Sequence, residues 1–227
     1  MGTGTQKEEM KMLQKIKRCL LLALTIVMLV PAVSGFAVTP KQAALNAYSR
    51  WLSGSRVQVM PKGYKDYMDN KLFAPVSASN TLFAIAYINN DTIPELVVKT
   101  TDGHYGSVLT YRNGKIVRLD YTDEVIGMIY GYYSKTGMYL NRRKWPDSIS
   151  KDSYKLMGAA GVKERFEIYT WKSGAKEMFY YDRNGKSVTL RNHTEFRNKL
   201  LTFTKGKTLT VYKFYRNTAA NRKNILK

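Results

Sequence analysis

Two short apolar runs separated by a polar turn occupy residues 82 to 101, LFAIAYINNDTIPELVVKTT. Each run is too short for a buried helix and is bounded by turn-forming residues, so both are predicted to be β-strands. The connection is rich in Asn, Asp and Pro, because Asx side chains hydrogen-bond within their own turn and Pro fixes φ. We expect the rest of the fold to be organised around this strand–turn–strand unit.

Apolar positions at helical spacing predict an amphipathic helix over residues 39 to 54. Thr39 and Gln42 have the spacing of a capping box, Pro40 suits the first turn, and Gly54 ends the helix. Shorter helices are expected from a Thr194 cap to Leu201 and from a Thr218 cap to Leu226. The apolar face of the first helix comprises Ala44, Leu45, Tyr48, Trp51 and Leu52.

Beyond residue 101, β-type runs alternate with turn signals. Asn113-Gly114 and Asn184-Gly185 are the strongest hairpin signals, and SKTG at 134–137 and KSG at 172–174 mark two further turns. Residues 143–165 are expected to form an irregular connection, and 209–215 one more strand or an extension into the tail. The spacing predicts an antiparallel meander with the first helix packed on it, which is an α+β fold.

The first 37 residues have the pattern of a secretory signal peptide. A basic segment precedes an apolar stretch of about a dozen residues (19–30), and small residues follow it, with cleavage expected after Ala37. The stretch is short for a membrane-spanning helix, although an uncleaved signal anchor is the alternative. We therefore expect residues 1–37 to be removed and 38–227 to form one secreted domain with no spanning segment.

Charge and cysteine content narrow the functional classes. Residues 38–227 contain 32 basic and 15 acidic residues, a formal net charge of +17, which favours attraction to polyanions. The one cysteine, Cys19, lies in the predicted leader, so the expected mature chain has no disulfide, thiolate metal site or cysteine nucleophile. Export without disulfides is more typical of a Gram-positive bacterium than of a eukaryotic secretory protein.

The turn at 87–95 resembles a known calcium loop. YINNDTIPELVV is similar to the DxDxDGxPEL stretch of secreted Firmicutes proteins, mostly of uncharacterised function, which is itself similar to the FG-GAP (VCBS-type) loop of β-propeller blades. The ending YRNTAANRKNILK resembles the NxTxENIxxxL closing pattern of the same proteins. The resemblance implies a sheet like a piece of propeller blade and a calcium site at Asn89, Asp91, Ile93 (by its carbonyl) and Glu95.

This sequence departs from that loop at several positions. Tyr87 and the neutral Asn89 occupy two of the ligand positions, so only Asp91 and Glu95 supply carboxylates, and calcium affinity depends on ligand charge. Two interpretations follow. The loop binds Ca²⁺ weakly, as the one cofactor implied, or it is a turn with a structural role and with Glu95 on the solvent side of its strand.

No catalytic motif is present. The chain has no GxSxG, HExxH, GxGxxG or P-loop sequence, and its two histidines, His104 and His193, lie beside turns, where solvated imidazoles are expected. Basic and aromatic residues alternate in several runs, which is the in/out pattern of strands, and nucleic acid is not an expected partner. The expected function is a non-enzymatic extracellular binding module. The alternatives are a basic protein that binds anionic cell-wall polymers or glycans, and an exported hydrolase with dispersed catalytic residues.

Overall fold

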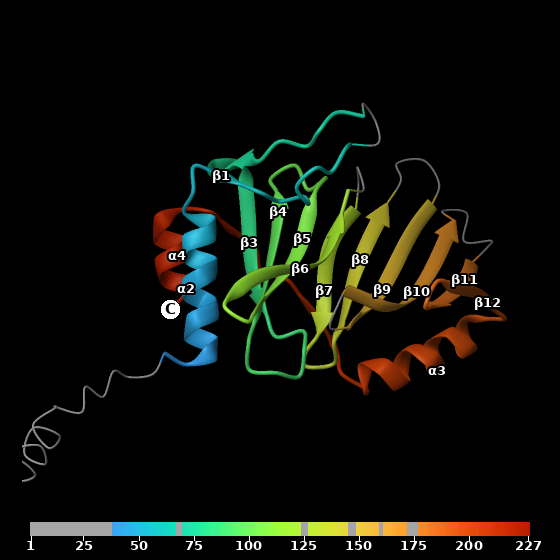
Figure 1. The fold of residues 1–227 in the computed structure, drawn as a ribbon. Helices are drawn as coiled ribbons and strands as arrows, with labels where there is room; N and C mark the ends of the chain where they lie inside the picture. Colours follow the sequence, from blue (N-terminus) through green and yellow to red (C-terminus); the bar gives the residue numbers. More distant parts are fainter. Residues whose placement is uncertain (1–37, 67–69, 124–126, 145–148, 159–160, 172–176) are drawn as a thin grey trace, which may run out of the picture. The chain divides into compact units, whose positions relative to one another are not determined.

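Two antiparallel sheets organise the part of the chain that the structure describes (Figure 1). The structure is a computed structural model and describes residues 38–66, 70–123, 127–144, 149–158, 161–171 and 177–227. The predicted signal peptide, residues 1–37, lies outside the described residues. Within these limits, the sheets and three α-helices of Thr39–Lys227 confirm a β-rich α+β fold with antiparallel pairing.

The predicted strand–turn–strand unit lies inside a five-stranded sheet. Its two strands are adjacent and antiparallel, with Phe83 opposite Val98 and Ala86 opposite Glu95. The strand order is β14-β3-β4-β5-β6, and the bounds are β3 Thr81–Ala86, β4 Glu95–Thr100, β5 Gly106–Arg112, β6 Lys115–Thr122 and β14 Tyr215–Arg216. A two-stranded sheet, β1 Arg56–Val57 with β2 Val76–Ser77, and the 3₁₀ turn η1 Ala78–Asn80 precede β3.

The second sheet has seven strands, six of them in a meander. Their order is β12-β11-β10-β9-β8-β7-β13. The bounds are β7 Gly127–Tyr133, β8 Met138–Lys144, β9 Ile149–Gly158, β10 Gly161–Trp171, β11 Glu177–Arg183, β12 Lys186–Leu190 and β13 Leu209–Val211. The Asn-Gly hairpins are confirmed, since Asn113, Gly114, Asn184 and Gly185 all have positive φ, as a type I′ turn requires.

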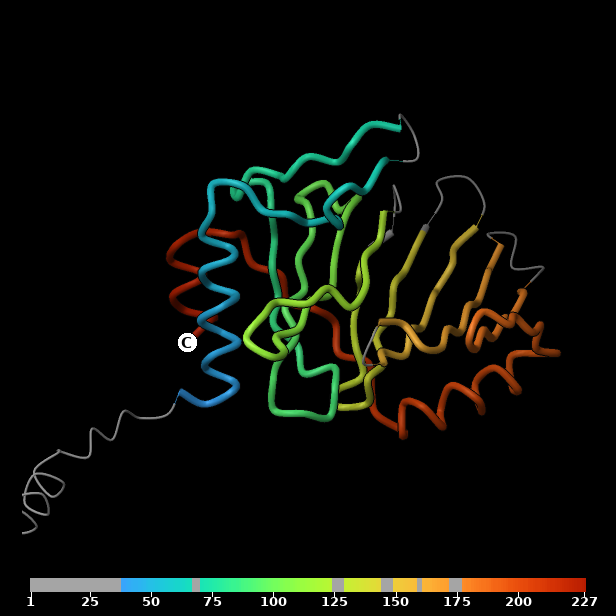
Figure 2. Tube along the Cα trace, viewed as in Figure 1, coloured from blue at the N-terminus to red at the C-terminus, as the bar shows by residue number. Residues whose placement is uncertain are grey.

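The helices begin at side-chain caps. In α2, Pro40–Leu52, the Thr39 hydroxyl accepts from the Gln42 N–H, as predicted. In α4, Ala219–Ile225, Thr218 caps Asn221 in the same way. The first and last helices lie side by side in the chain trace (Figure 2). They cover one face of the five-stranded sheet, where Tyr48 and Leu52 pack against Phe83 and Leu96.

Three apolar clusters hold these layers together. The first lies between α2, α4 and one face of the five-stranded sheet, and the second lies on the opposite face, where Val97 and Val108 meet Ile129 and Tyr139 of the seven-stranded sheet. Strands β3 and β4 are therefore buried on both faces, which explains their nearly continuous apolar sequences. The third cluster lies under α3, His193–Thr204, where Phe196 packs on β10 and β11.

Three sequence predictions are corrected. Residues 143–165, expected to be irregular, complete β8, form β9 and begin β10, because polar residues on both faces conceal the alternation of these strands. Residues 209–215 contribute to two strands, β13 and β14, in different sheets. Helix α3 is capped by Asn192 and not by Thr194, so it begins two residues earlier than predicted.

Candidate functional site

The predicted calcium-loop residues lie in the connection from β3 to β4, at the junction of the two sheets. Glu95 is the first residue of β4 and is fully buried, so the expectation that it faces solvent is wrong. Its Oε2 accepts the backbone N–H groups of Ile88 (2.9 Å) and Asn89 (3.4 Å), and its Oε1 accepts Nδ2 of Asn89 (2.6 Å). Both carboxylate oxygens thus accept hydrogen bonds from the loop itself.

The other two predicted ligands are arranged differently. Asp91 is exposed, and its Oδ1 accepts the N–H of Ile93 at 3.0 Å, which is an Asx turn. The structure therefore brings Asn89 to Glu95 and Asp91 to Ile93, each pair joined by an internal hydrogen bond. Among the described residues, no group of three or more His, Cys, Asp or Glu side chains is placed to hold a metal ion. These internal hydrogen bonds favour the interpretation of the loop as a structural turn, and a calcium titration distinguishes it from a weak Ca²⁺ site.

The geometry gives Glu95 a structural role between the sheets. The loop that it holds presents the carbonyl groups of Tyr87 and Ile88, which accept the N–H groups of Lys135 (2.9 Å) and Gly137 (2.7 Å) in the β7–β8 turn. Burial raises the pKa of Glu95 to about 7, against the effect of the N–H donors of Ile88 and Asn89. The carboxyl group thus fixes the loop whose carbonyl groups bond to the other sheet, and it titrates near neutrality.

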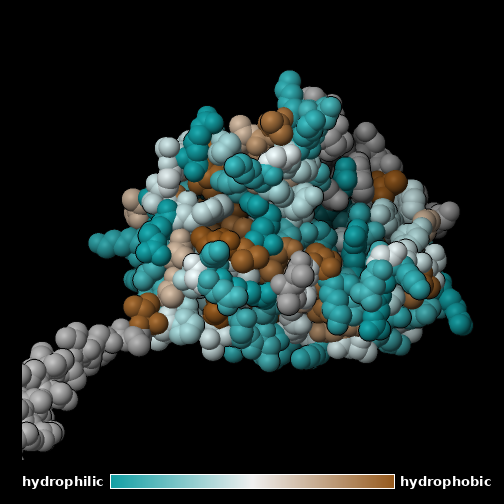
Figure 3. All heavy atoms as spheres, in the orientation of Figure 1, coloured by the Kyte–Doolittle hydropathy of each residue, from teal (hydrophilic) through white to brown (hydrophobic). Residues whose placement is uncertain are grey.

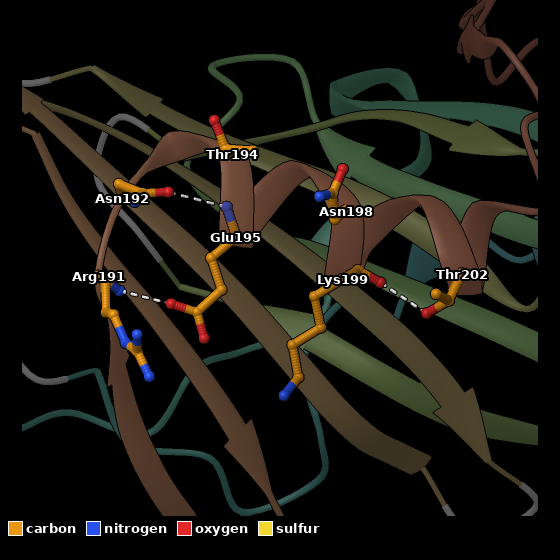
Figure 4. Close-up of a pocket in the computed structure, with 7 residues that line it drawn as sticks. All are labelled: Arg191, Asn192, Thr194, Glu195, Asn198, Lys199 and Thr202. Atoms are coloured by element: carbon orange, nitrogen blue, oxygen red, sulfur yellow. Dashed lines mark hydrogen bonds between the residues drawn. The ribbon is translucent and has the colours of Figure 1, made fainter.

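Helix α3 carries a polar groove on its exposed side. Its N-terminus is fixed by two backbone-to-side-chain bonds: the Glu195 N–H donates to Oδ1 of Asn192 (3.0 Å), and the Arg191 N–H donates to Oε2 of Glu195 (2.9 Å). Figure 4 shows the side chains of Arg191, Glu195 and Lys199 extending in the same direction from this part of the chain. The groove is completed by the amide and hydroxyl side chains of Asn192, Thr194, Asn198 and Thr202.

Cations predominate along this helix and the turn after it. Arg191, Lys205 and Lys207 are exposed, while Lys199 is half-buried, with Nζ 4.1 Å from the centre of the Tyr181 ring. Between residues 191 and 207 the chain has five basic residues and one acidic residue, Glu195. We call Arg191, Lys199, Lys205 and Lys207 the α3 basic surface. Figure 3 shows hydrophilic residues over most of the strand and helix region around α3, and hydrophobic residues gathered nearer the middle of the view.

A second cavity lies on the other side of α3, between the helix and the face formed by β9 and β10. Ser150, Asp152 and His193 all line it, which is the set of residue types that a hydrolase would use. However, Asp152 is held in a bidentate pair by Arg142 (Nε–Oδ1 2.8 Å, Nη2–Oδ2 2.7 Å), and within the described chain no hydrogen bond joins the three side chains. His193 stacks on Phe179 instead, so no catalytic relay is preformed.

The opposite face of the seven-stranded sheet carries a network of charged side chains. Glu167 accepts from Ser153 Oγ (3.2 Å) and Tyr169 Oη (3.1 Å) and pairs with Lys151 (3.0 Å) and Arg165 (3.5 Å). Burial tends to raise the pKa of Glu167, but Lys151 outweighs it and holds this pKa below its usual value. The carboxylate therefore stays ionised and satisfied, which indicates a structural network.

Sequence reasoning missed both sites around α3. The spacing of Asn192 and Glu195 was a readable capping signal, and the excess of Lys and Arg after residue 186 was visible in composition. The cavity had no comparable signal, because it joins residues more than 40 positions apart.

Comparison of the chain with protein-family models, with curated proteins and with solved structures gives no match. No helix in the described ranges is long and apolar enough to cross a membrane.

Proposed function

We propose that this protein is a secreted, non-enzymatic binding module whose α3 basic surface binds anionic polymers outside the cell. Phosphate- or sulfate-bearing cell-wall polymers and glycans have the chemistry that such a surface would attract. Export rests on the leader pattern of residues 1–37. In the described part of the chain, no hydrogen bond joins the side chains of Ser150, Asp152 and His193, which favours binding over hydrolysis.

The observation that carries this proposal is the segregation of charge in the last part of the chain. Residues 186–227 contain eleven basic residues and one acidic residue. That one carboxylate, Glu195, is engaged with the Arg191 N–H at the start of α3, where the helix dipole also favours negative charge. The exposed Arg191, Lys205 and Lys207 form no ion pair with any described residue.

The test is a binding measurement with a poly(glycerol phosphate) chain and a sulfated glycan. The substitution set Arg191→Gln, Lys199→Gln, Lys205→Gln and Lys207→Gln removes the α3 basic surface. At roughly 1 kcal/mol for each Lys or Arg beside an anionic surface, losing all four should weaken binding by up to about a thousandfold. The matched control removes the same charge from four exposed cations between residues 41 and 62, namely Lys41, Arg50, Arg56 and Lys62.

The electrostatic account also requires a dependence on ionic strength. Affinity should fall steeply with added salt, because exposed charges are screened within about 10 Å at 0.1 M. Equal weakening in the two substitution sets would mean that net charge and not the α3 basic surface is responsible. Binding that persists unchanged in high salt would contradict the proposal.

A further inference from the structure

The cavity between α3 and the seven-stranded sheet, which we call the α3–sheet cavity, has the features of a small-molecule site. Its volume is about 180 Å³. Apolar cavities of about 150 Å³ hold a benzene molecule, so this space is large enough for one ring or a short aliphatic chain. It is bounded by every second side chain along β9 and β10, which share one face of the sheet, and by side chains on one face of α3.

The inner wall of the cavity is apolar and well anchored. Ile168 of β10 and Phe196 and Leu200 of α3 supply it. The Phe196 ring contacts the rings of Tyr154 (6.0 Å between centroids) and Phe179 (5.4 Å), so the helix is fixed on the sheet by aromatic packing. The cavity is therefore held open by groups that cannot easily collapse into it.

Hydrogen-bond donors without a partner in the described chain lie beside this apolar wall. Ser150 and Thr170 lie opposite each other on β9 and β10, and their hydroxyl groups make no hydrogen bond within the described chain. Arg197, one helical turn after His193, has an exposed guanidinium that forms no ion pair with any described residue. The carboxylate of Asp152 forms an ion pair with Arg142, which neutralises its charge. The cavity rim therefore has a net positive charge, that of Arg197.

We propose that the α3–sheet cavity binds a small monocarboxylate with an apolar body. The apolar part would lie against Ile168 and Leu200, and the carboxylate would accept from Arg197 and from the hydroxyl groups of Ser150 and Thr170. A planar guanidinium suits this role because it can donate two parallel hydrogen bonds to a carboxylate. This site does not depend on the proposed polymer binding, since none of its residues belongs to the α3 basic surface.

The probe is benzoate, titrated into the purified protein and followed by calorimetry and by NMR. For a ligand of this size, even a low binding efficiency per atom corresponds to a dissociation constant of about 10 mM, which sets the weakest binding to be sought. Saturable binding of one equivalent is expected. Benzamide, which has the same shape without the charge, should bind at least about tenfold more weakly.

Substitutions separate recognition from folding. Arg197→Gln should weaken benzoate binding at least about tenfold, and Thr170→Val should weaken it less, while Arg191→Gln on the other side of α3 should leave it unchanged. Leu200→Trp should block the cavity, and a melting curve shows whether each variant is folded. No saturable binding at about 10 mM, equal affinity for benzamide, or unchanged affinity in Arg197→Gln would each overturn the proposal.

Discussion

The titration of Glu95 should lower the unfolding free energy of this protein as the pH rises from 4.5 to 8. Comparison with Glu95→Gln measures this contribution. The carboxyl group is fully buried between the sheets, and burial raises its pKa from 4.5 to about 7. The native state therefore binds the proton more tightly than the unfolded chain. The resulting stabilisation is complete below pH 4.5 and is lost as the pH rises through 7.

The size of the effect follows from the same values. One pKa unit is worth about 1.4 kcal/mol, so a rise from 4.5 to about 7 corresponds to about 3 kcal/mol between the two limits. Glu95→Gln keeps the size of the side chain and removes its titration. Wild type should exceed this variant in unfolding free energy by about 3 kcal/mol more at pH 4.5 than at pH 8.

Chemical denaturation at a series of pH values measures this difference, because other titrating groups are common to both proteins and cancel. Glu177→Gln, at an exposed position at the start of β11, is the matched control and should follow the wild-type curve. Parallel curves for wild type and Glu95→Gln would refute the reasoning. They would mean that the N–H groups of Ile88 and Asn89 stabilise the carboxylate enough to offset its burial.

Three further predictions concern the β3–β4 loop, helix α3 and the predicted signal peptide. Millimolar Ca²⁺ should not raise the melting temperature more than Mg²⁺ does, because Glu95 and Asp91 already accept N–H groups of their own loop. A calcium-specific rise that disappears in Asp91→Ala would show that the loop binds Ca²⁺. Phe196→Ala should lower the unfolding free energy by about 3–5 kcal/mol, since this ring anchors α3, whereas the exposed Leu201→Ala should cost far less; equal losses on denaturation would argue against that packing. If residues 1–37 act as the predicted signal peptide, mass spectrometry of the protein expressed in a secreting bacterium should find Val38 at its N-terminus. Retention of residues 1–37 would indicate a signal anchor.

Much of the local structure could be predicted from neighbouring residues alone. Thr39 and Thr218 cap helices where the sequence indicated, and the Asn-Gly pairs form hairpins, because these features depend on side-chain-to-backbone bonds over two or three positions. The antiparallel pairing of residues 81–86 with 95–100 likewise follows from two apolar runs and a short polar turn. The α+β class could therefore be read from the sequence.

Tertiary structure decided what lies between those elements. Glu95 is buried where the β3–β4 loop meets the β7–β8 turn of the second sheet, and no pattern of adjacent residues predicts that contact. Strand β9 was missed because it carries polar residues on both faces. Ser153 bonds to Glu167 of β10 on one face, and Asp152 pairs with Arg142 of β8 on the other. The cavity under α3 exists only where a helix stripe meets two strands distant in sequence. Contacts of this kind are set by how layers pack, whereas caps and turns are set by a few adjacent dihedral angles and hydrogen bonds.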